Sequence, residues 1–430
     1  MDLDRLLADF VQEHSSGMQQ RDANWYASMG VTVGGSELAA IMGRNSYSSF
    51  YDVVESKLAV LAGASSWAGG GEACWWGTLF EDVISAFVEA DLGSPARGGD
   101  ICIQKYPGHR NSPDGYIVAR IYRESDSEGC DGEYHIWTTD MDPGTVTSQL
   151  ILLLEFKCPM RRKPCGEVPR QYVPQVWSGL AVSPVAHLGL FVDAVFRKCG
   201  LDDLGDTPDY DVSYHRGDRG AWDLPVAWGL IGVYAPRRAA DDAAAADDAA
   251  ADDADAERAA RQIHLECLGM ADYDNVVDLG DMEPRLFARA LGLIDRKQFP
   301  VRRGAACFAD GRGAALRTGR DVAVAIEAFR AGAPAAHWLM GILPWKLFEV
   351  DYVAVAPRPG FMEEVAPLIA EVHRTVAEAR AAPDPAAYMR TARRLAPRPG
   401  APPTSLCEDG RPPGLEITQK VIQDLFDCCN

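Results

Sequence analysis

The chain is organised around the stretch LILLLEFKCP, residues 150–159. Five apolar residues run directly into a polar end that is stopped by Pro159, and so short a run predicts a strand buried on both faces. Alternate residues of a strand share a face. One face is therefore entirely apolar, whereas the other face ends in Glu155 and Lys157. The sequence predicts a buried strand that brings a carboxylate and an ammonium to one edge of a sheet.

These two charges have two interpretations. Burying them is costly unless each finds a partner. A salt bridge at a strand end is the simpler interpretation, and on this stretch alone it is the more common one, because E-x-K after an apolar run is a weak pattern. A metal ion and a phosphodiester would be the alternative partners.

The composition limits the class of protein. The chain has 430 residues, of which 47% are hydrophobic and 24% charged, enough for one large domain or two smaller ones. The formal net charge of −20 argues against a generally basic nucleic-acid binder. Part of the acid, however, is concentrated in residues 239–260, which are almost purely Ala and Asp and predict a disordered or loose solvated segment. Net charge is therefore a poor guide to any local site.

The cysteines and the N-terminus indicate the compartment. The 11 cysteines are an odd number without paired C-x-x-C spacing, and the acidic, amphipathic N-terminus is unlike a secretory signal. We expect reduced thiols and an intracellular, non-secreted protein. No apolar stretch is long enough to span a membrane, so no membrane partner is expected.

Hydrophobic periodicity predicts helices over residues 3–13, 49–61 and 75–93. In the third helix Glu81 lies off the apolar stripe. An acid in a first turn is usually favoured by the helix dipole alone. The functional alternative is that Glu81 points into a shared metal site.

A glycine pair, Gly34–Gly35, marks a turn before Ser36, a good N-cap residue for a short helix over residues 37–42. Backbone N–H groups at such a terminus can hold a phosphate. An ordinary tight turn is as frequent an explanation, so the pattern alone proves little.

Residues 100–106 are predicted to form a strand. The turn sequence Ser-Pro-Asp-Gly then leads straight into a strand over 116–122, which places Asp114 where a strand begins. The polar segment 123–146 is predicted to be a long hairpin excursion before the central strand.

A basic cluster follows that strand, with few acids near it. It is a solvated loop in the simpler interpretation, whereas beside a metal site it would hold a DNA backbone. Its members are Arg161, Arg162, Lys163 and Arg170.

Beyond the cluster, RQYVPQVWSGLAV reads as a helix, and further strands are predicted over 188–196, 224–236 and 345–357. Helices are expected over 321–331 and 361–380, and residues 381–413 read as a tail or linker.

Five stretches, taken in order, resemble the YqaJ-like viral recombinase family, the exonucleases similar to that of phage lambda, and more distantly the herpesvirus alkaline nucleases. They are GGSELAAIMG at 34–43, WGTLFE at 76–81, SPDG at 112–115, LEFKCP at 154–159 and YVPQVWSGLAV at 172–182. The resemblance covers about residues 25–200 and 345–380.

The resemblance implies an α/β fold with a PD-(D/E)xK, restriction-endonuclease-like core, in which a mixed central β-sheet is flanked by helices. It divides the chain into a first core part with the active site, an insertion that includes the acidic run, a closing strand and helix, and a Pro/Ala/Arg-rich tail. These parts are residues 1–200, 201–340, 341–380 and 381–430.

The resemblance also implies a metal-dependent exonuclease that acts on double-stranded DNA ends in viral-type recombination or genome processing. It implies two ions of Mg²⁺ or Mn²⁺, held by carboxylates and one backbone carbonyl, with a lysine that orients the attacking water. The metal ligands would be Asp114, Glu155, Phe156 through its carbonyl, and Glu81. The remaining catalytic residues would be Lys157 and Gln175, which matches a glutamine in the family's helix.

For DNA binding, the resemblance adds Gly35, Ser36 and Tyr172 to the basic cluster. The family often has an arginine shortly before the glycine–serine turn, where it grips a terminal 5′-phosphate. This chain has none there, so Arg21 or Arg44 is the expected substitute.

A single-strand annealing protein and a homo-oligomer are further expected partners beside double-stranded DNA, in the cytoplasm or nucleus of a host cell if the chain is viral. A structure-specific or restriction-like endonuclease on the same core is the alternative function. A catalytically inactive DNA-binding scaffold is a second alternative, against which Asp114, Glu155 and Lys157 argue.

Overall fold

The computed structural model describes most of the chain. The described residues are 2–15, 23–63, 72–123, 134–139, 141–160, 162–205, 225–236, 276–282, 287, 301–302, 304–308, 313 and 316–395. The acidic run 239–260, the predicted Arg21 and Arg161, and residues 396–430 lie outside them.

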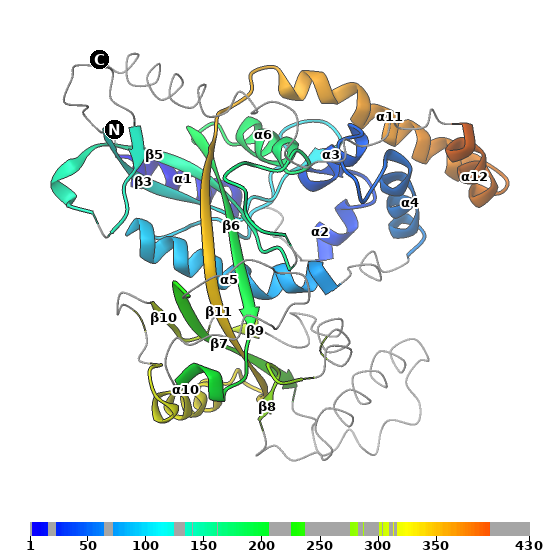
Figure 1. Ribbon diagram of the computed structural model, residues 1–430. Helices are drawn as coiled ribbons and strands as arrows, with labels where there is room; N and C mark the ends of the chain where they lie inside the picture. The colour runs from blue at the N-terminus through cyan, green and yellow to red at the C-terminus, as the bar shows by residue number, and fades with distance from the viewer. Residues whose placement is uncertain are drawn as a thin grey trace, which may run out of the picture.

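A nine-stranded sheet forms the centre of the molecule (Figure 1). Its strand order is β10-β7-β11-β6-β5-β3-β4, with β8 paired to β11 and β9 paired to β7. The strands are β3 (Gly115–Arg123), β4 (Tyr134–Ile136), β5 (Val146–Lys157), β6 (Leu188–Lys198), β7 (Ala227–Pro236), β8 (Val277–Asp278), β9 (Val301–Arg302), β10 (Ala306–Phe308) and β11 (His337–Val355). β5 and β6 are parallel, whereas β3 and β5 are antiparallel. The predicted mixed sheet is therefore confirmed.

The helices pack on both sides of this sheet. They are α1 (Leu3–Ser15), α2 (Ala23–Ser28), α3 (Leu38–Ile41), α4 (Phe50–Leu61), α5 (Glu72–Leu92), α6 (Val173–Val182), α7 (Asp202–Gly205), α10 (Gly319–Ala331), α11 (Phe361–Ala381) and α12 (Pro385–Leu395), with 3₁₀ turns η1 (Gly35–Glu37) and η2 (Pro143–Thr145). α5 covers one face, while α1 and α6 cover the other. α3, α4, α11 and α12 share a further apolar core. The predicted α/β class, a mixed sheet flanked by helices, is confirmed.

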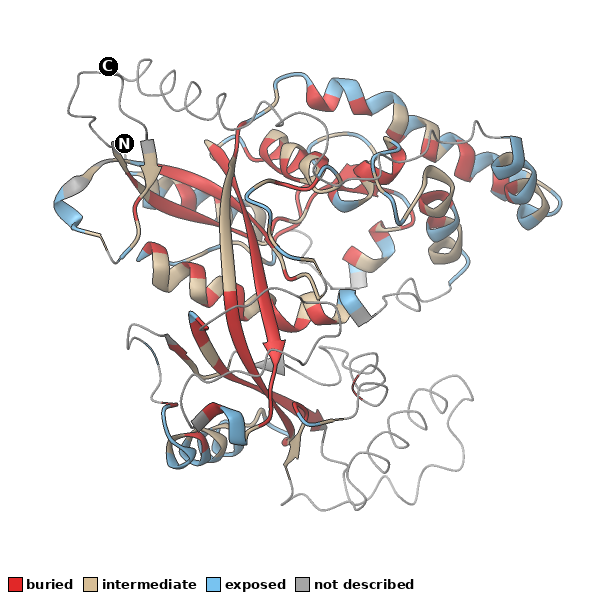
Figure 2. Cartoon of the chain, in the orientation of Figure 1, coloured by how far each residue is buried: buried red, intermediate tan, exposed pale blue. Residues whose placement is uncertain are grey.

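β5 is buried on both faces, as its sequence predicts (Figure 2). Leu152 and Leu154 pack toward α5 in one core, and Ile151 and Leu153 pack toward α1 and α6 in the other. Each fully buried leucine contributes about 2 kcal/mol of hydrophobic free energy. The strand is thereby fixed in register on both sides, and its polar end is fixed with it.

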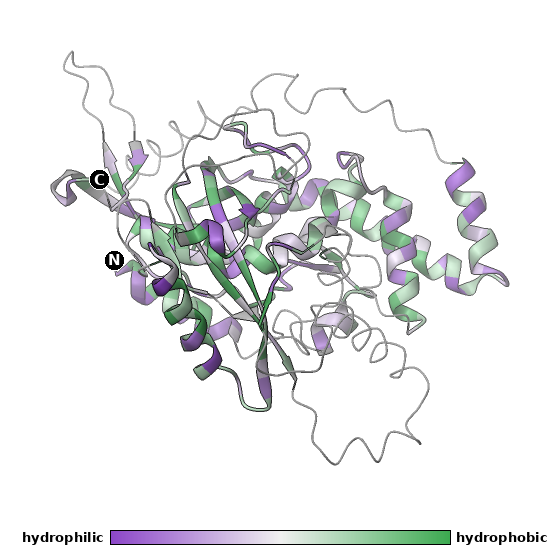
Figure 3. Cartoon of the chain, turned by 60° about the horizontal axis from the view of Figure 1, so that its bottom comes forward, coloured by the Kyte–Doolittle hydropathy of each residue, from purple (hydrophilic) through white to green (hydrophobic). Residues whose placement is uncertain are grey.

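Hydropathy follows the same layers (Figure 3). The strands are largely hydrophobic, and the surrounding helices alternate hydrophobic and hydrophilic faces. No described helix is long and apolar enough to cross a membrane.

β11 is longer than the predicted strand over 345–357. Its second half, from Trp345, pairs with β6, and its first half, from His337 to Leu347, pairs with β7. One strand thus belongs both to the predicted core and to the predicted insertion, and the sheet continues across both. The division into four parts stays a prediction.

Two predicted segments were wrong in type. Residues 100–106 contain no strand, because Ile103 makes only an isolated bridge to Asn111. The alternation came from the burial of Ile101 and Ile103, not from a ladder. Within the predicted tail, residues 385–395 form α12, which buries Met389.

Candidate active site

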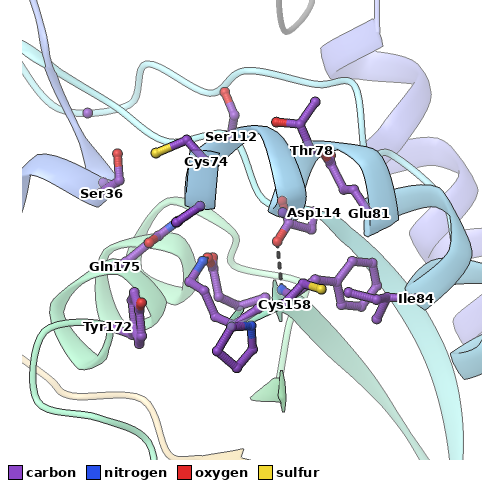
Figure 4. Close-up of a pocket in the computed structure, with 18 of the residues that line it drawn as sticks. Ser36, Cys74, Thr78, Glu81, Ile84, Ser112, Asp114, Cys158, Tyr172 and Gln175 are labelled. Atoms are coloured by element: carbon purple, nitrogen blue, oxygen red, sulfur yellow. Dashed lines mark hydrogen bonds and ion pairs between the residues drawn. The ribbon is translucent and has the colours of Figure 1, made fainter. Parts of the chain in front are cut away.

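A cavity of about 400 Å³ opens where β3 begins and β5 ends, below α5 and beside α6 (Figure 4). It brings together side chains from stretches that lie far apart in the sequence. All five predicted catalytic residues line it: Asp114, Glu155, Lys157, Glu81 and Gln175. Further predicted residues that line it are Phe156, Gly35, Ser36, Arg162 and Tyr172.

Antiparallel pairing places Asp114 beside the end of β5. Gly115 is the register partner of Leu154, so the residue before β3 lies next to the residues after Leu154. The N–H of Phe156 donates to Asp114 Oδ2 at 2.6 Å, and the N–H of Asp114 donates to the carbonyl of Leu154 at 3.2 Å. The pairing of β3 with β5 therefore brings together Asp114 and Phe156, which are 42 residues apart in the sequence. Residues 124–133, within the hairpin excursion between the two strands, lie outside the described chain.

Glu155 and Lys157 lie side by side on one face of β5. The Glu155 side chain is 2% exposed, and Lys157 Nζ donates to its Oε1. Lys157 Nζ also lies 5.0 Å from the centre of the Tyr172 ring, a cation–π distance. The simpler interpretation of E-x-K, a salt bridge, is thus present, and it lies inside the cavity that also holds Asp114.

The electrostatics of the cavity favour a further positive charge. Burial raises the pKa of Asp114, and the carboxylates of Glu155 and Glu81 raise it further. Burial also raises the pKa of Glu155, although Lys157 opposes this. Burial would lower the pKa of Lys157, but Glu155 and Asp114 outweigh it and the pKa is raised. Three acids therefore face one ammonium, and a divalent cation would offset the excess negative charge.

The donor set suits a hard cation, because Mg²⁺ and Mn²⁺ prefer carboxylate and carbonyl oxygens. Glu81 points from α5 toward Asp114 (Figure 4). The side chains are not arranged as a closed shell: among the described residues, no three His, Cys, Asp or Glu side chains are grouped so that they could hold a metal. Asp114 instead accepts from Phe156, and Glu155 accepts from Lys157.

The Gly34–Ser36 turn forms one wall of the cavity, but the predicted role of Ser36 as a helix N-cap was wrong. Gly34 is the cap residue of η1, and its N–H donates to Glu37 Oε2 at 2.6 Å. Lys57, which is 1% exposed, donates to the same carboxylate at 2.8 Å. The buried Lys57 thus holds the Glu37 carboxylate where it accepts the hydrogen bond from the Gly34 N–H. Ser36 lines the cavity instead.

Gly35 is a glycine because of close packing. A Cβ there would collide with Asn111 Nδ2 and lie 3.1 Å from Ser178 Oγ. Asn111 Nδ2 donates to Ser178 Oγ at 2.6 Å and to the carbonyl of Gln175 at 3.4 Å. Asn111 therefore ties the turn to α6, which carries Gln175.

Arg110 is a cavity residue that the sequence did not reveal. The short parallel pair β1 (Val33–Gly34) and β2 (His109–Arg110) makes Arg110 the register partner of Gly34. Its guanidinium donates to Thr32 Oγ1 at 2.9 Å and lies 5.3 Å from the Trp25 ring centre. A two-residue pairing leaves no periodic signal, so only the position of Arg110 just before SPDG could have suggested it.

Among the described members of the predicted basic DNA-binding set, Arg162 alone lines the cavity. Arg44 is exposed and is not one of the lining residues. Arg162 lines the cavity, but its guanidinium forms a two-pronged ion pair with the buried Asp193. Lys163 and Arg170 are exposed on the following loop. Arg110, rather than Arg44, is the arginine beside the glycine turn.

Relatives of known sequence match most of the chain. A protein of African swine fever virus (strain Badajoz 1971 Vero-adapted) is 26% identical over 385 residues, which cover 87% of this chain and 91% of the relative. The counterpart of this first relative from the isolate Tick/Malawi/Lil 20-1/1983 of that virus is 35% identical over 229 residues, which cover 52% of this chain and 63% of that relative.

Among solved structures, two crystal structures of LHK-Exo are similar to part of the chain. One is an alkaline exonuclease from Laribacter hongkongensis, and the other is LHK-Exo in complex with dAMP. Each is 18% identical, covers 40% of this chain and has a TM-score of 0.26, which is too low to define a shared fold. The matched region spans 74% of the first LHK-Exo chain and 73% of the chain in the dAMP complex.

The family comparison falls on the segment that builds the cavity. The description of the matching family model is YqaJ-like viral recombinase domain, and the match spans residues 20–186. This range contains the Gly34–Ser36 turn, Asp114 and the whole of β5. Residues 20–186 are therefore similar to the YqaJ-like viral recombinase domain.

Proposed function

We propose that the chain is a metal-dependent deoxyribonuclease that hydrolyses phosphodiester bonds from the ends of double-stranded DNA. The observation that carries the proposal is the convergence of Asp114, Glu155 and Lys157 on one cavity, inside a YqaJ-like viral recombinase domain. Two acids and a lysine at a sheet edge suit phosphoryl transfer, in which charge develops on the phosphate.

Mg²⁺ or Mn²⁺, as one or two ions, would be held by Asp114, Glu155, Glu81 and the carbonyl of Phe156. The three side chains are not grouped as a metal site in the structure, so they would have to turn toward the ion to bind it. The metal would supply an activated water and stabilise the leaving oxygen. The buried carboxylates support this assignment. Burial raises the pKa values of Asp114 and Glu155 and so disfavours their charged forms, and a bound cation would stabilise these charged forms.

The chain's own residues position the reacting groups. Lys157 contributes the positive charge that offsets the negative charge building on the phosphate, and its contact with Tyr172 keeps it at the cavity wall. Asp114 is oriented by the N–H of Phe156. Gln175, in the first turn of α6, lies where it can donate to the phosphate or to the attacking water.

The end of the DNA strand would lie at the opposite wall, which carries Ser36, Ser112 and Arg110. Two hydroxyls and a guanidinium suit a terminal phosphate, which prefers charge-assisted hydrogen bonds. Arg110 is 5% exposed and is held in place by Thr32 and Trp25. Little side-chain entropy is lost when so constrained an arginine binds.

Linear and covalently closed duplexes of the same sequence test the end preference. With Mg²⁺, the protein should degrade the end-labelled linear duplex progressively and leave the relaxed closed circle intact. Cleavage of both at a similar rate would contradict an exonuclease and favour the endonuclease alternative on the same core.

The biological role in this proposal is viral-type recombination or genome processing inside a host cell. It is supported by the description of the family model and by the viral relatives. A single-strand annealing protein is the partner that such a role would require, and self-association of the nuclease is compatible with it.

A further inference from the structure

A second cavity, of about 280 Å³, lies on the other side of the catalytic aspartate. It shares Glu81, Asp114 and Phe156 with the first cavity. Its remaining walls come from α5 and from the loop over residues 96–100. The catalytic carboxylates therefore separate two cavities, and only the first contains the Ser36, Ser112 and Arg110 wall.

The loop over residues 96–100 is held firmly against the active site. The N–H of Arg97 donates to the carbonyl of Tyr116 at 2.9 Å, and the N–H of Tyr116 donates back at 2.8 Å. At Gly99, a Cβ would lie 2.8 Å from the carbonyl oxygen of Asp114, so only glycine permits this approach. The backbone of Arg97 is thus fixed relative to the start of β3.

Arg97 carries the positive charge of this second cavity. Its side chain is exposed and lines the cavity. Within the described part of the chain, its guanidinium has no ion pair or hydrogen bond, since its interactions are the two backbone bonds to Tyr116. Arg162 of the first cavity, in contrast, is bound by Asp193. An unpaired guanidinium beside a catalytic centre is available for an anion.

The neighbouring acids limit what can bind. Asp82 and Asp100 line the same cavity, together with the shared Glu81 and Asp114, so a phosphate would be repelled everywhere except near Arg97. This charge distribution suits one phosphate bound by one arginine. It does not suit a longer stretch of DNA backbone, which would need a basic groove.

We propose that the second cavity receives the backbone phosphate on the duplex side of the scissile bond, and that Arg97 binds it. This inference rests on the proposed function. With the strand end at Ser36 and Ser112 and the scissile phosphate at Lys157, the strand continues past Asp114 into the second cavity. Arg97 is then a positioning residue that aligns the strand across the carboxylates.

A methylphosphonate scan tests the assignment. A neutral methylphosphonate is placed at the phosphate next to the scissile bond on its duplex side, and single-turnover cleavage is measured for the parent and for Arg97→Ala. The parent should lose about tenfold in rate on the neutralised strand, within the range of one charge-assisted hydrogen bond. Arg97→Ala should lose about tenfold on the unmodified strand and little more on the neutralised one.

Arg390→Ala is the matched control, because Arg390 is 70% exposed on α12, outside both cavities. It should respond to the methylphosphonate as the parent does. If the losses from Arg97→Ala and from the methylphosphonate multiply, the two groups do not interact and the inference is overturned while the proposed function stands. If the parent cleaves no DNA, both are overturned.

Asp100→Asn separates a phosphate site from a cation site. Removing this exposed acid should tighten the binding of duplex DNA, most clearly at low salt, where charges are least screened. Weaker DNA binding by Asp100→Asn would mean that the second cavity holds a cation, and would overturn the assignment.

Discussion

The ion pair between Lys157 and Glu155 serves the fold and the proposed chemistry together. A carboxylate that is 2% exposed requires a compensating charge, and Lys157 supplies it two residues away on the same strand face. Strand alternation made this pair predictable from the sequence, because E-x-K in a buried strand can only place both side chains on one side. Asp114 was predictable as a strand-start residue, but its hydrogen bond to Phe156 depends on the β3–β5 register.

Arg110 gives a residue-scale prediction for the end of the DNA. Arg110→Ala should reduce the preference for a 5′-phosphorylated end over a 5′-hydroxyl end by about tenfold, because one charge-assisted hydrogen bond is lost. The ratio of the two cleavage rates is measured, so the amount of folded protein cancels. Arg44→Ala is the control and should keep the parent ratio. Loss of the 5′-phosphate preference in Arg44→Ala but not in Arg110→Ala would contradict this prediction and would identify Arg44 as the residue that binds the terminal phosphate.

His109 gives a prediction about pH. Its side chain is fully buried, and burial lowers its pKa to about 4, whereas the unfolded chain keeps the ordinary value near 6.5. The unfolded state therefore binds the extra proton first, and the free energy of unfolding should fall by roughly 3 kcal/mol as pH drops from about 6.5 to about 4. Histidine NMR should show a neutral His109 ring at pH 5.5. A ring that protonates near pH 6.5 would contradict this.

At the scale of elements, the turn η1 shows what the sequence could and could not predict. Gly34 and Gly35 mark a turn in any interpretation, and the structure confirms it. Its capping was mispredicted because Glu37 is held by Lys57, a residue twenty positions away in α4. A tertiary ion pair of this kind overrides the local preference for Ser36 as a cap.

Two glycine substitutions test the packing of this turn. Gly35→Ala should lower the free energy of unfolding by about 1–3 kcal/mol, because the new methyl group collides with Asn111. Gly77→Ala, in the interior of α5, meets no atom within 4 Å and should raise it by about 0.5–1 kcal/mol through helix propensity. Chemical denaturation measures both. Equal effects of the two changes would contradict the close approach at Gly35.

Long elements were predictable and short or composite ones were not. α5 and α11 carry apolar periodicity over 21 residues each, which a single sequence shows clearly. β1 and β2 contain two residues each, so the pairing that brings Arg110 to the cavity leaves no pattern. α12 was hidden in a Pro- and Arg-rich segment, and it forms because Met389 is buried and Arg393 pairs with Asp52.

In the whole molecule, the long strand β11 joins the two halves of the sheet. It pairs with β6 beside the active-site strand and with β7 in the predicted insertion. The sequence showed the strand but not its length. The residues before Trp345 are apolar, and an apolar run by itself does not show whether it belongs to the strand or to another part of the core. The net charge of −20 also hides the local arrangement, in which Arg110, Lys157 and Arg97 lie around the carboxylates.

We propose that Glu155 and its neighbours in the first cavity make this chain a metal-dependent nuclease. The most direct test of this proposal is single-turnover cleavage of an end-labelled linear duplex by the parent and by Glu155→Gln, each with Mg²⁺ and with EDTA. The glutamine keeps the size of the side chain and removes the charge, and circular dichroism verifies that it folds. Cleavage is expected only by the parent with Mg²⁺, with at least a hundredfold loss in the variant, about the effect of removing one transition-state stabilising group. Cleavage by Glu155→Gln at the parent rate, or by either protein in EDTA, would contradict it.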